Sequence, residues 1–139
     1  MAIKTVIDTN VLVSALSSRS IYHWLILQLL DEKIDLSVTE EILLEYEEIL
    51  KQKYSNSVAE NFLTALRELP NVHYTRVYYQ WKLLKDEDDN KFVDCYIASN
   101  SNYLITNDSD FNSLKALKFP LVNILSLQEF ELELLKSRP

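Results

Sequence analysis

The chain contains no glycine, although glycine makes up about 7% of an average protein. Glycine-rich phosphate loops, whether of the dinucleotide-binding or the Walker A kind, are therefore excluded, and so is the G-x-S-x-G turn of α/β-hydrolases. His23 and His73 are too far apart for the H-E-x-x-H zinc motif, and Cys95 is the only cysteine, which excludes an internal disulfide and a cysteine zinc site. The chemistry that remains is that of carboxylates.

The composition is that of an ordinary globular protein, with 47% hydrophobic and 25% charged residues among 139. A chain of this length forms one domain, which we expect over residues 1–139. Neither an apolar run of the ~20 residues that span a membrane nor a signal-peptide pattern is present, since Lys4 interrupts the first apolar run. We therefore expect a cytoplasmic protein with no membrane partner. The net charge of −7 argues against a broad basic nucleic-acid surface, unless acids gather around divalent cations.

Short apolar runs rich in β-branched residues alternate with amphipathic segments of helical periodicity. This alternation predicts an α/β protein with three layers, α/β/α, around a central parallel sheet of about five strands. Thr39 is the expected N-cap of the longest helix. Strands are expected at residues 1–8, 34–38, within 71–79, 103–106 and 121–125, and helices at 11–16, 21–30, 40–54, 58–69, 88–99, 111–117 and from 127.

Two of the expected strands end on an aspartate, in "TVIDTN" at Asp8 and in "YLITND" at Asp108. Parallel sheets bind ligands at the carboxyl ends of their strands, so both carboxylates are expected on one edge of the sheet. Each also stands where it could cap the following helix, and this alternative stays open.

Two further acids lie on expected helices. Glu45 stands at the edge of the apolar stripe of its helix and faces inward, although a partly solvated edge position is the alternative. Asp94 is the lone charge in "FVDCYIA", and no lysine or arginine lies four residues before or after it. Because a lone buried carboxylate is costly unless it is paired, hydrogen-bonded or bound to a metal, we interpret Asp94 as a metal ligand.

The acidic run "DEDDN" begins like a calcium-binding loop, but Lys91 and Ile97 stand where an EF-hand requires glycine and glutamate. The run is better interpreted as the acidic start of a helix, with Asp89 near the other acids as an outer group. The segment "HYTRVYYQWKLLK" mixes aromatic and cationic residues, a composition that suits stacking of single-stranded bases. We favour the alternative that its rings cover the sheet or a dimer surface.

Together these segments resemble the PIN-domain family, which are small metal-dependent ribonucleases. The resemblance rests on "VIDTNVLVSAL", "TEEILLEYEEIL", "DDNKFVDCYIAS" and "NYLITNDSDF", and it spans nearly the whole chain. The D-D-N-K-F motif is similar to the corresponding sequence of a subgroup identified as toxins of type II toxin–antitoxin pairs. Many relatives have glycine where Asn107 stands, and asparagine tolerates the left-handed backbone that glycine would use there.

The resemblance implies a site for one or two Mg²⁺ or Mn²⁺ ions that hydrolyses RNA to a 3′-hydroxyl and a 5′-phosphate. Asp8, Asp94 and Asp108 would be the nearest ligands, while Glu45 would bind metal or orient the water. The resemblance further implies that Asn10 and Thr106 support the site by hydrogen bonding, and that Asp110 is an additional acid. It also implies a cognate antitoxin and a homodimer. Since carboxylates repel each other without metal, Mn²⁺ is expected to stabilise the fold, and Asp94→Asn to weaken that response.

Two alternatives remain. A PIN-fold module with a silent site would bind nucleic acid or protein without turnover. A phosphoacceptor receiver-like domain needs an aspartate at the end of a central third strand and a lysine after the fifth. The third expected strand has no aspartate, and Ser126 follows the fifth, so the sequence disfavours this alternative.

Overall fold

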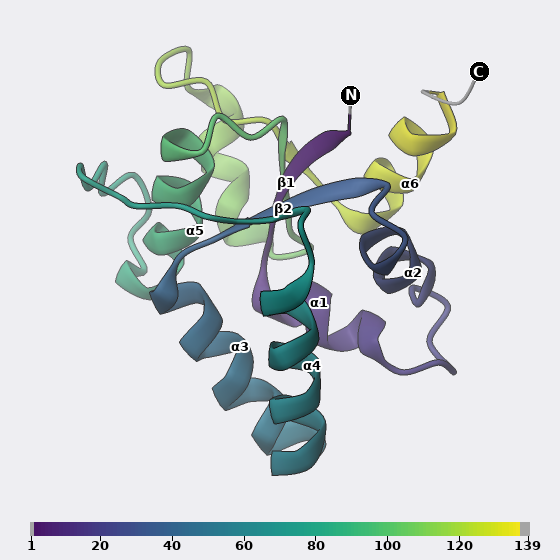
Figure 1. The fold of residues 1–139 in the computed structure, drawn as a ribbon. Coiled ribbons are helices and arrows are strands. Elements are labelled where there is room, and N and C mark those ends of the chain that lie inside the picture. Colours follow the sequence, from purple (N-terminus) through teal and green to yellow (C-terminus); the bar gives the residue numbers. More distant parts are fainter. Residues whose placement is uncertain (1, 137–139) are drawn as a thin grey trace.

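A single parallel sheet of five strands, in the order β3–β2–β1–β4–β5, forms the centre of the computed structural model, which describes residues 2–136 (Figure 1). The strands are β1 (Ile3–Ile7), β2 (Ile34–Val38), β3 (Val72–Tyr74), β4 (Tyr103–Ile105) and β5 (Ile124–Leu125). Chain order runs outward from β1 in both directions, so the switch point of the sheet lies between β1 and β4. Ligands of open parallel sheets bind at the carboxyl ends of the strands beside that point.

Helices cover both faces of this sheet, as the three-layer prediction required. Helix α5 lies across β1, β2 and β4 on one face, while α2 contacts β2 and α6 contacts β5 (Figure 1). Trp24 of α2 packs against Phe130 of α6, which joins these two helices. Helices α1, α3 and α4 gather where β1 and β2 end (Figure 1). The helical elements are α1 (Thr9–Leu16), α2 (Trp24–Leu30), α3 (Glu40–Lys53), α4 (Asn56–Glu68), α5 (Glu87–Ala98), the 3₁₀ helix η1 (Ser109–Ala116) and α6 (Leu127–Lys136).

The elements lie close to their predicted ranges, and Thr39 caps α3 as expected, because its hydroxyl accepts a hydrogen bond from the Ile42 N–H at 3.1 Å. The helix expected at 111–117 is a 3₁₀ helix that begins earlier, since Asp108 caps it. The last strand is only two residues long, because Ile124 and Leu125 alone pair with β4. Met1, the start of the first expected strand, lies outside the described residues.

The apolar core fixes the strand ends on which the site depends. Val6 and Ile7 of β1 and Leu104 and Ile105 of β4 are all 0% exposed. A strand packed on both faces holds the residue that follows it more rigidly than a loop does. The residues just after β1 and β4 therefore have well-defined positions.

The sheet order also settles one alternative. In the receiver-like order the third strand is central, whereas β3 here lies at an edge. The receiver-like interpretation is therefore wrong. Among residues 2–136, no helix has both the length and the apolar character that a membrane crossing requires.

Residues 75–86, which we call the strap, join β3 to α5 without forming a helix or strand. The Thr75 N–H donates to the Val38 carbonyl at 2.8 Å, and beyond this bond the chain leaves the sheet. The strand expected within residues 71–79 is thus only its first part. The strap then runs beside α5. It carries most of the aromatic and cationic residues that were singled out in the sequence.

Candidate active site

Asp8 stands at the switch point and is 7% exposed. Its N–H donates to the Ile105 carbonyl at 3.0 Å, which ties the end of β1 to β4. Its backbone carbonyl accepts the first bonds of α1, but its side chain caps nothing. Instead Oδ2 accepts a hydrogen bond from the Thr106 hydroxyl at 2.8 Å. The capping alternative therefore does not explain the Asp8 carboxylate.

Thr106 links the two strand-end aspartates. Its Oγ1 donates to Asp8 and accepts from the Asp108 N–H at 3.0 Å. Asp108 in turn accepts the Asp110 N–H at 2.9 Å, so the capping alternative does hold for this residue. A cap uses one carboxylate oxygen of Asp108 and leaves its second oxygen available.

Four carboxylates gather here, and we call Asp8, Asp89, Asp108 and Asp110 the acid cluster. The last three each offer one oxygen, and these oxygens lie within 4.8 Å of one another. Burial raises the pKa of Asp89 to about 6, and the charges of Asp86, Asp8 and Asp108 add to the increase. Burial also raises the pKa of Asp8, with further repulsion from Glu45 and Asp108, against the hydrogen bond from Thr106. Negative charge is thus disfavoured here without a cation.

Glu45 flanks the acid cluster, and both of its oxygens have partners. Oε2 accepts a hydrogen bond from the Thr9 hydroxyl, and Oε1 forms an ion pair with Lys91 at 2.7 Å. The Glu45 side chain is 27% exposed and that of Lys91 only 10%. The sequence reasoning missed Lys91, although a single cation that follows four consecutive acids was a usable signal.

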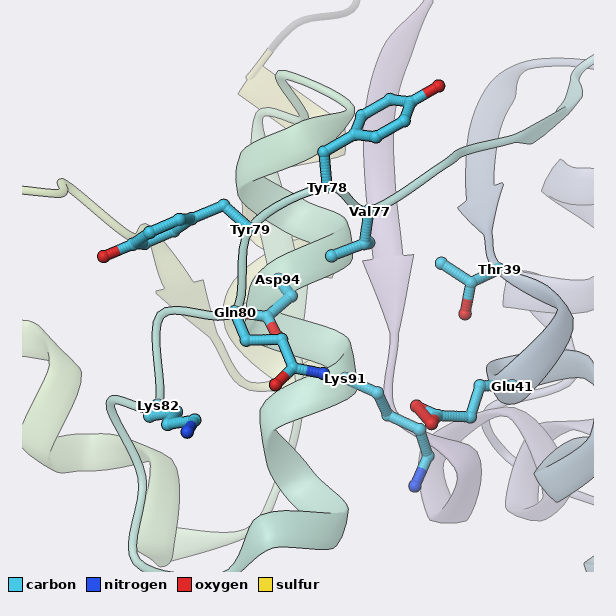
Figure 2. Close-up of a pocket in the computed structure, with 9 residues that line it drawn as sticks. All are labelled: Thr39, Glu41, Val77, Tyr78, Tyr79, Gln80, Lys82, Lys91 and Asp94. Carbon is cyan, nitrogen blue, oxygen red and sulfur yellow. The ribbon is translucent and has the colours of Figure 1, made fainter.

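Asp94 does not join the acid cluster, contrary to the sequence-based assignment. It is 7% exposed, as expected, but its Oδ1 accepts the backbone N–H of Trp81, in the strap, at 3.0 Å. Burial raises its pKa, which the Trp81 bond opposes and the nearby charge of Glu41 reinforces. Asp94 lines a cavity of about 530 Å³ together with Gln80, Lys82 and Glu41 (Figure 2). The cost of burying the Asp94 carboxylate is therefore offset by a backbone donor, and no metal ion at the acid cluster is needed to explain its burial.

Helical geometry explains why Asp89 stands where Asp94 was expected. Both are on α5, five residues apart, and at 100° per residue their side chains point about 140° away from each other. Asp89 was predicted only as an outer group, yet it lies close enough to Asp8 and Asp108 for their charges to raise its pKa. We therefore replace Asp94 by Asp89 in the candidate ligand set.

Two asparagines differ from expectation. Asn10 is exposed, and within residues 2–136 its side chain makes no hydrogen bond. It lines a hollow of about 420 Å³ that also reaches Asp8 and Asp108. Asn107 does not adopt a left-handed backbone. Its Oδ1 instead accepts the Leu127 N–H at 3.0 Å and so holds the start of α6.

A thiol mechanism is excluded by the position of Cys95. The residue is 0% exposed, and burial raises its pKa to about 12. A thiol with such a pKa is not ionised at neutral pH and is not a nucleophile. The chemistry of this site is therefore carboxylate chemistry, as the composition predicted.

The sheet order and the acid cluster define an α/β fold with carboxylates at its switch point, and the sequence comparison gives the family. Residues 4–110 match the family model described as PIN domain. The chain therefore belongs to the PIN domain family, which confirms the family and the general activity predicted from the sequence. A search of curated proteins finds no significant match.

Solved structures of distant relatives share the fold. The VapBC2 complex of Rickettsia felis, crystallised with a DNA fragment from its promoter, has a chain with a TM-score of 0.63 and 15% identity, over 89% of this chain and 98% of that one. VapC20 of Mycobacterium tuberculosis, a toxin that cleaves the sarcin–ricin loop, has a TM-score of 0.58 and 16% identity, over 78% of this chain and 93% of VapC20. The PIN domain of T. brucei RRP44 has a TM-score of 0.52 and 10% identity, over 99% of this chain and 83% of that domain. At such identities the similarity concerns the fold alone.

Proposed function

We propose that this chain is a divalent-metal-dependent endoribonuclease and the toxin of a type II toxin–antitoxin pair. The observation that supports the proposal best is the acid cluster. Four carboxylates from three separate parts of the chain converge at the switch point of the sheet, where ligands of such folds bind. Burial raises the pKa of Asp8 and of Asp89, and the charges of neighbouring acids add to the increase at both residues.

The residues present fit a hard divalent cation. Carboxylate oxygens are the ligands that Mg²⁺ and Mn²⁺ prefer, and the oxygens of Asp89, Asp108 and Asp110 are close enough to share one ion. We propose these three and Asp8 as ligands of one or two ions. When bound, such an ion would stabilise charge on the scissile phosphate and lower the pKa of a water.

The chain's own groups position the ligands. The Thr106 hydroxyl orients Asp8 and fixes the Asp108 backbone, as the family resemblance implied. Thr9 and Lys91 hold Glu45 beside the acid cluster, so we propose that Glu45 acts on the attacking water. We propose that Asn10, which lines the adjoining hollow, contacts substrate.

The toxin role rests on the family and on the kind of relatives that share the fold. Two of these relatives are VapBC2, crystallised on promoter DNA, and VapC20, a toxin that cleaves the sarcin–ricin loop. We extend to this chain an RNA substrate, a cognate antitoxin, a homodimer and a cytoplasmic location. The family match and the single sheet support treating residues 1–139 as one PIN-like domain.

The test is cleavage of an unstructured labelled RNA by pure protein in Mn²⁺ or in EDTA. Asp8→Asn removes a ligand charge, and since metal ions contribute several kcal/mol to such transition states, cleavage should fall by at least about a hundredfold. Asp31→Asn makes the same chemical change at an exposed residue just before β2. This residue lies near the amino ends of the strands, away from the acid cluster at their carboxyl ends, so the variant should cleave like the wild type.

The other outcomes separate the alternatives. Equal cleavage by wild type and Asp8→Asn would show that the activity comes from a contaminating nuclease. If neither protein cleaves any RNA in Mn²⁺, the alternative of an interaction module with a silent site gains support. The acid cluster would then be an inactive remnant.

A further inference from the structure

The basic residues of this acidic chain are unevenly distributed. The chain carries a net charge of −7, yet residues 69–85 contain no acid and three cations, Arg76, Lys82 and Lys85. Residues 111–128 likewise contain no acid and carry Lys115 and Lys118. All five cations are exposed. Residues 69–85, which include most of the strap, and residues 111–128 are therefore basic regions of a protein that otherwise repels polyanions.

These two regions are joined by aromatic rings. Tyr79 and Trp81 of the strap lie edge to face at 4.9 Å between ring centroids, and Trp81 meets Phe119 in the same way at 6.0 Å. Tyr79 is 65% exposed and Phe119 is 82% exposed. The rings of Tyr78 and Tyr79 point outward from the strap (Figure 2). These rings therefore do not cover the sheet, and the alternative that they form a dimer surface stays a prediction.

Three neighbouring hollows that share lining residues lie between the strap and the acid cluster. The 530 Å³ cavity beneath Tyr79 shares Lys82 with a second hollow of about 430 Å³. That hollow shares Lys85 with a third, also about 430 Å³, which is lined by Asp89 and Asp110. These hollows place the exposed rings, two lysines and part of the acid cluster next to one another, and Glu41 and Asp94 also line the first two.

Helix α5 fixes the strap in this position. Asn90 bonds Leu84 twice, accepting its N–H at 2.9 Å and donating to its carbonyl at 3.1 Å. Asp94, one turn further along the same face of the helix, accepts the Trp81 N–H. The same helix carries Asp89 of the acid cluster. Because one helix holds the strap and carries Asp89, a nucleic-acid strand bound along the strap would have a fixed position relative to the acid cluster.

We propose that the strap, together with Phe119, binds single-stranded RNA and delivers it to the acid cluster. This inference rests on the proposed function, because a polyanionic substrate must approach four carboxylates and needs cations beside them. Lys82 and Lys85 would contact phosphates, and the rings of Tyr79 and Phe119 would stack on bases. Stacking requires unpaired bases, which selects single strands over duplexes. Asp94 is a positioning residue of this surface.

The test is the fluorescence anisotropy of a labelled oligouridine bound to the Asp8→Asn protein in Mg²⁺, which prevents cleavage during the measurement. Tyr79→Ala combined with Phe119→Ala should raise Kd about tenfold or more, because each stacked ring contributes strongly to single-strand affinity. Tyr79→Phe keeps the ring and should bind normally. Leu132→Ala truncates a side chain that is 59% exposed on α6 and serves as the apolar control.

The lysines are tested by salt dependence. Lys82→Ala and Lys85→Ala should each lower the slope of log Kd against log salt concentration by about 0.7, the value for one phosphate contact to a single strand. Lys33→Ala removes an exposed cation just before β2, at the opposite edge of the sheet, and should leave the slope unchanged.

Cleavage by the wild type in Mn²⁺ is measured on the same RNA, which separates the two proposals. Unchanged Kd and slope in the strap variants, with a wild type that cleaves, would overturn the RNA-binding role and leave the strap as a surface for a protein partner. A wild type that neither binds nor cleaves any RNA would overturn both proposals.

Discussion

Helix α5 carries two aspartates that differ in almost every respect except residue type. Asp94 is buried at 7% exposure and bonded to the strap, while Asp89 is less buried and faces other carboxylates. Burial is the leading cause of the raised pKa at both positions. Asp94 has a backbone donor and one acidic neighbour, Glu41, whereas Asp89 has three acidic neighbours.

The comparison shows that burial alone does not identify a metal ligand. A buried carboxylate must be compensated, and a backbone N–H can do this as well as a cation. What distinguishes Asp89 is the number of acids beside it, since three of them raise its pKa whereas Glu41 alone does so at Asp94. Uncompensated repulsion is the feature that a bound cation would relieve.

The largest difference should appear in the response to Mn²⁺. At a concentration about 100 times Kd, binding adds about 2.7 kcal/mol to the free energy of unfolding, which for a chain of this size raises Tm by about 5–10 °C. Asp89→Asn removes a proposed ligand and should abolish most of that shift. Asp94→Asn should retain it, which reverses the expectation from the sequence. Thermal denaturation with Mn²⁺ and with EDTA measures both.

This experiment has a clear contrary result. A shift that survives Asp89→Asn and disappears in Asp94→Asn would restore the assignment made from the sequence. A wild-type Tm that does not respond to millimolar Mn²⁺ would argue against any metal site in the acid cluster.

A smaller difference should separate two substitutions of Asp94. Asparagine keeps the oxygen that accepts the Trp81 N–H and removes a charge near Glu41, so Asp94→Asn should be about as stable as wild type. Asp94→Ala removes the acceptor and should lose about 1–2 kcal/mol of unfolding free energy. Urea denaturation in EDTA gives both values. Equal stability of the two variants would mean that the bond does not hold the strap.

Much of the fold followed from the sequence because its signals are local. Strand composition, helical periodicity and the Thr39 cap each depend on neighbouring residues, and Asp8 and Asp108 could be placed because a strand's carboxyl end fixes the sheet edge. The shortness of β5 depends on its pairing with β4, which is distant in sequence, and local patterns do not show such pairing.

The site was harder to predict because its partners are distant in sequence. The partner of Asp94 is a backbone N–H of the strap, and no side-chain pattern reveals such a donor. Helical periodicity shows that Asp89 and Asp94 point about 140° apart on α5, and the response to Mn²⁺ tests which of them binds metal. Lys91 could be singled out in the sequence as the one cation after four acids, but its partner Glu45, on another helix, could not.

The smallest effect, and the one most specific to the acid cluster, is the pH dependence of stability without metal. The folded pKa of Asp89 is about 6, above the ordinary 3.8, and that of Asp8 is shifted in the same direction. Between these values the folded state holds a proton that the unfolded chain has lost, so this stabilisation is full below about 3.8 and is lost as pH rises through about 6. The protein in EDTA should therefore be less stable at pH 7.5 than at pH 5.5, as measured by urea denaturation. Asp89→Asn should flatten the dependence, and saturating Mn²⁺ should remove it because a cation favours the charged carboxylates. Stability that rises with pH across this range in EDTA would show that the carboxylates of the acid cluster do not repel one another as the structure indicates.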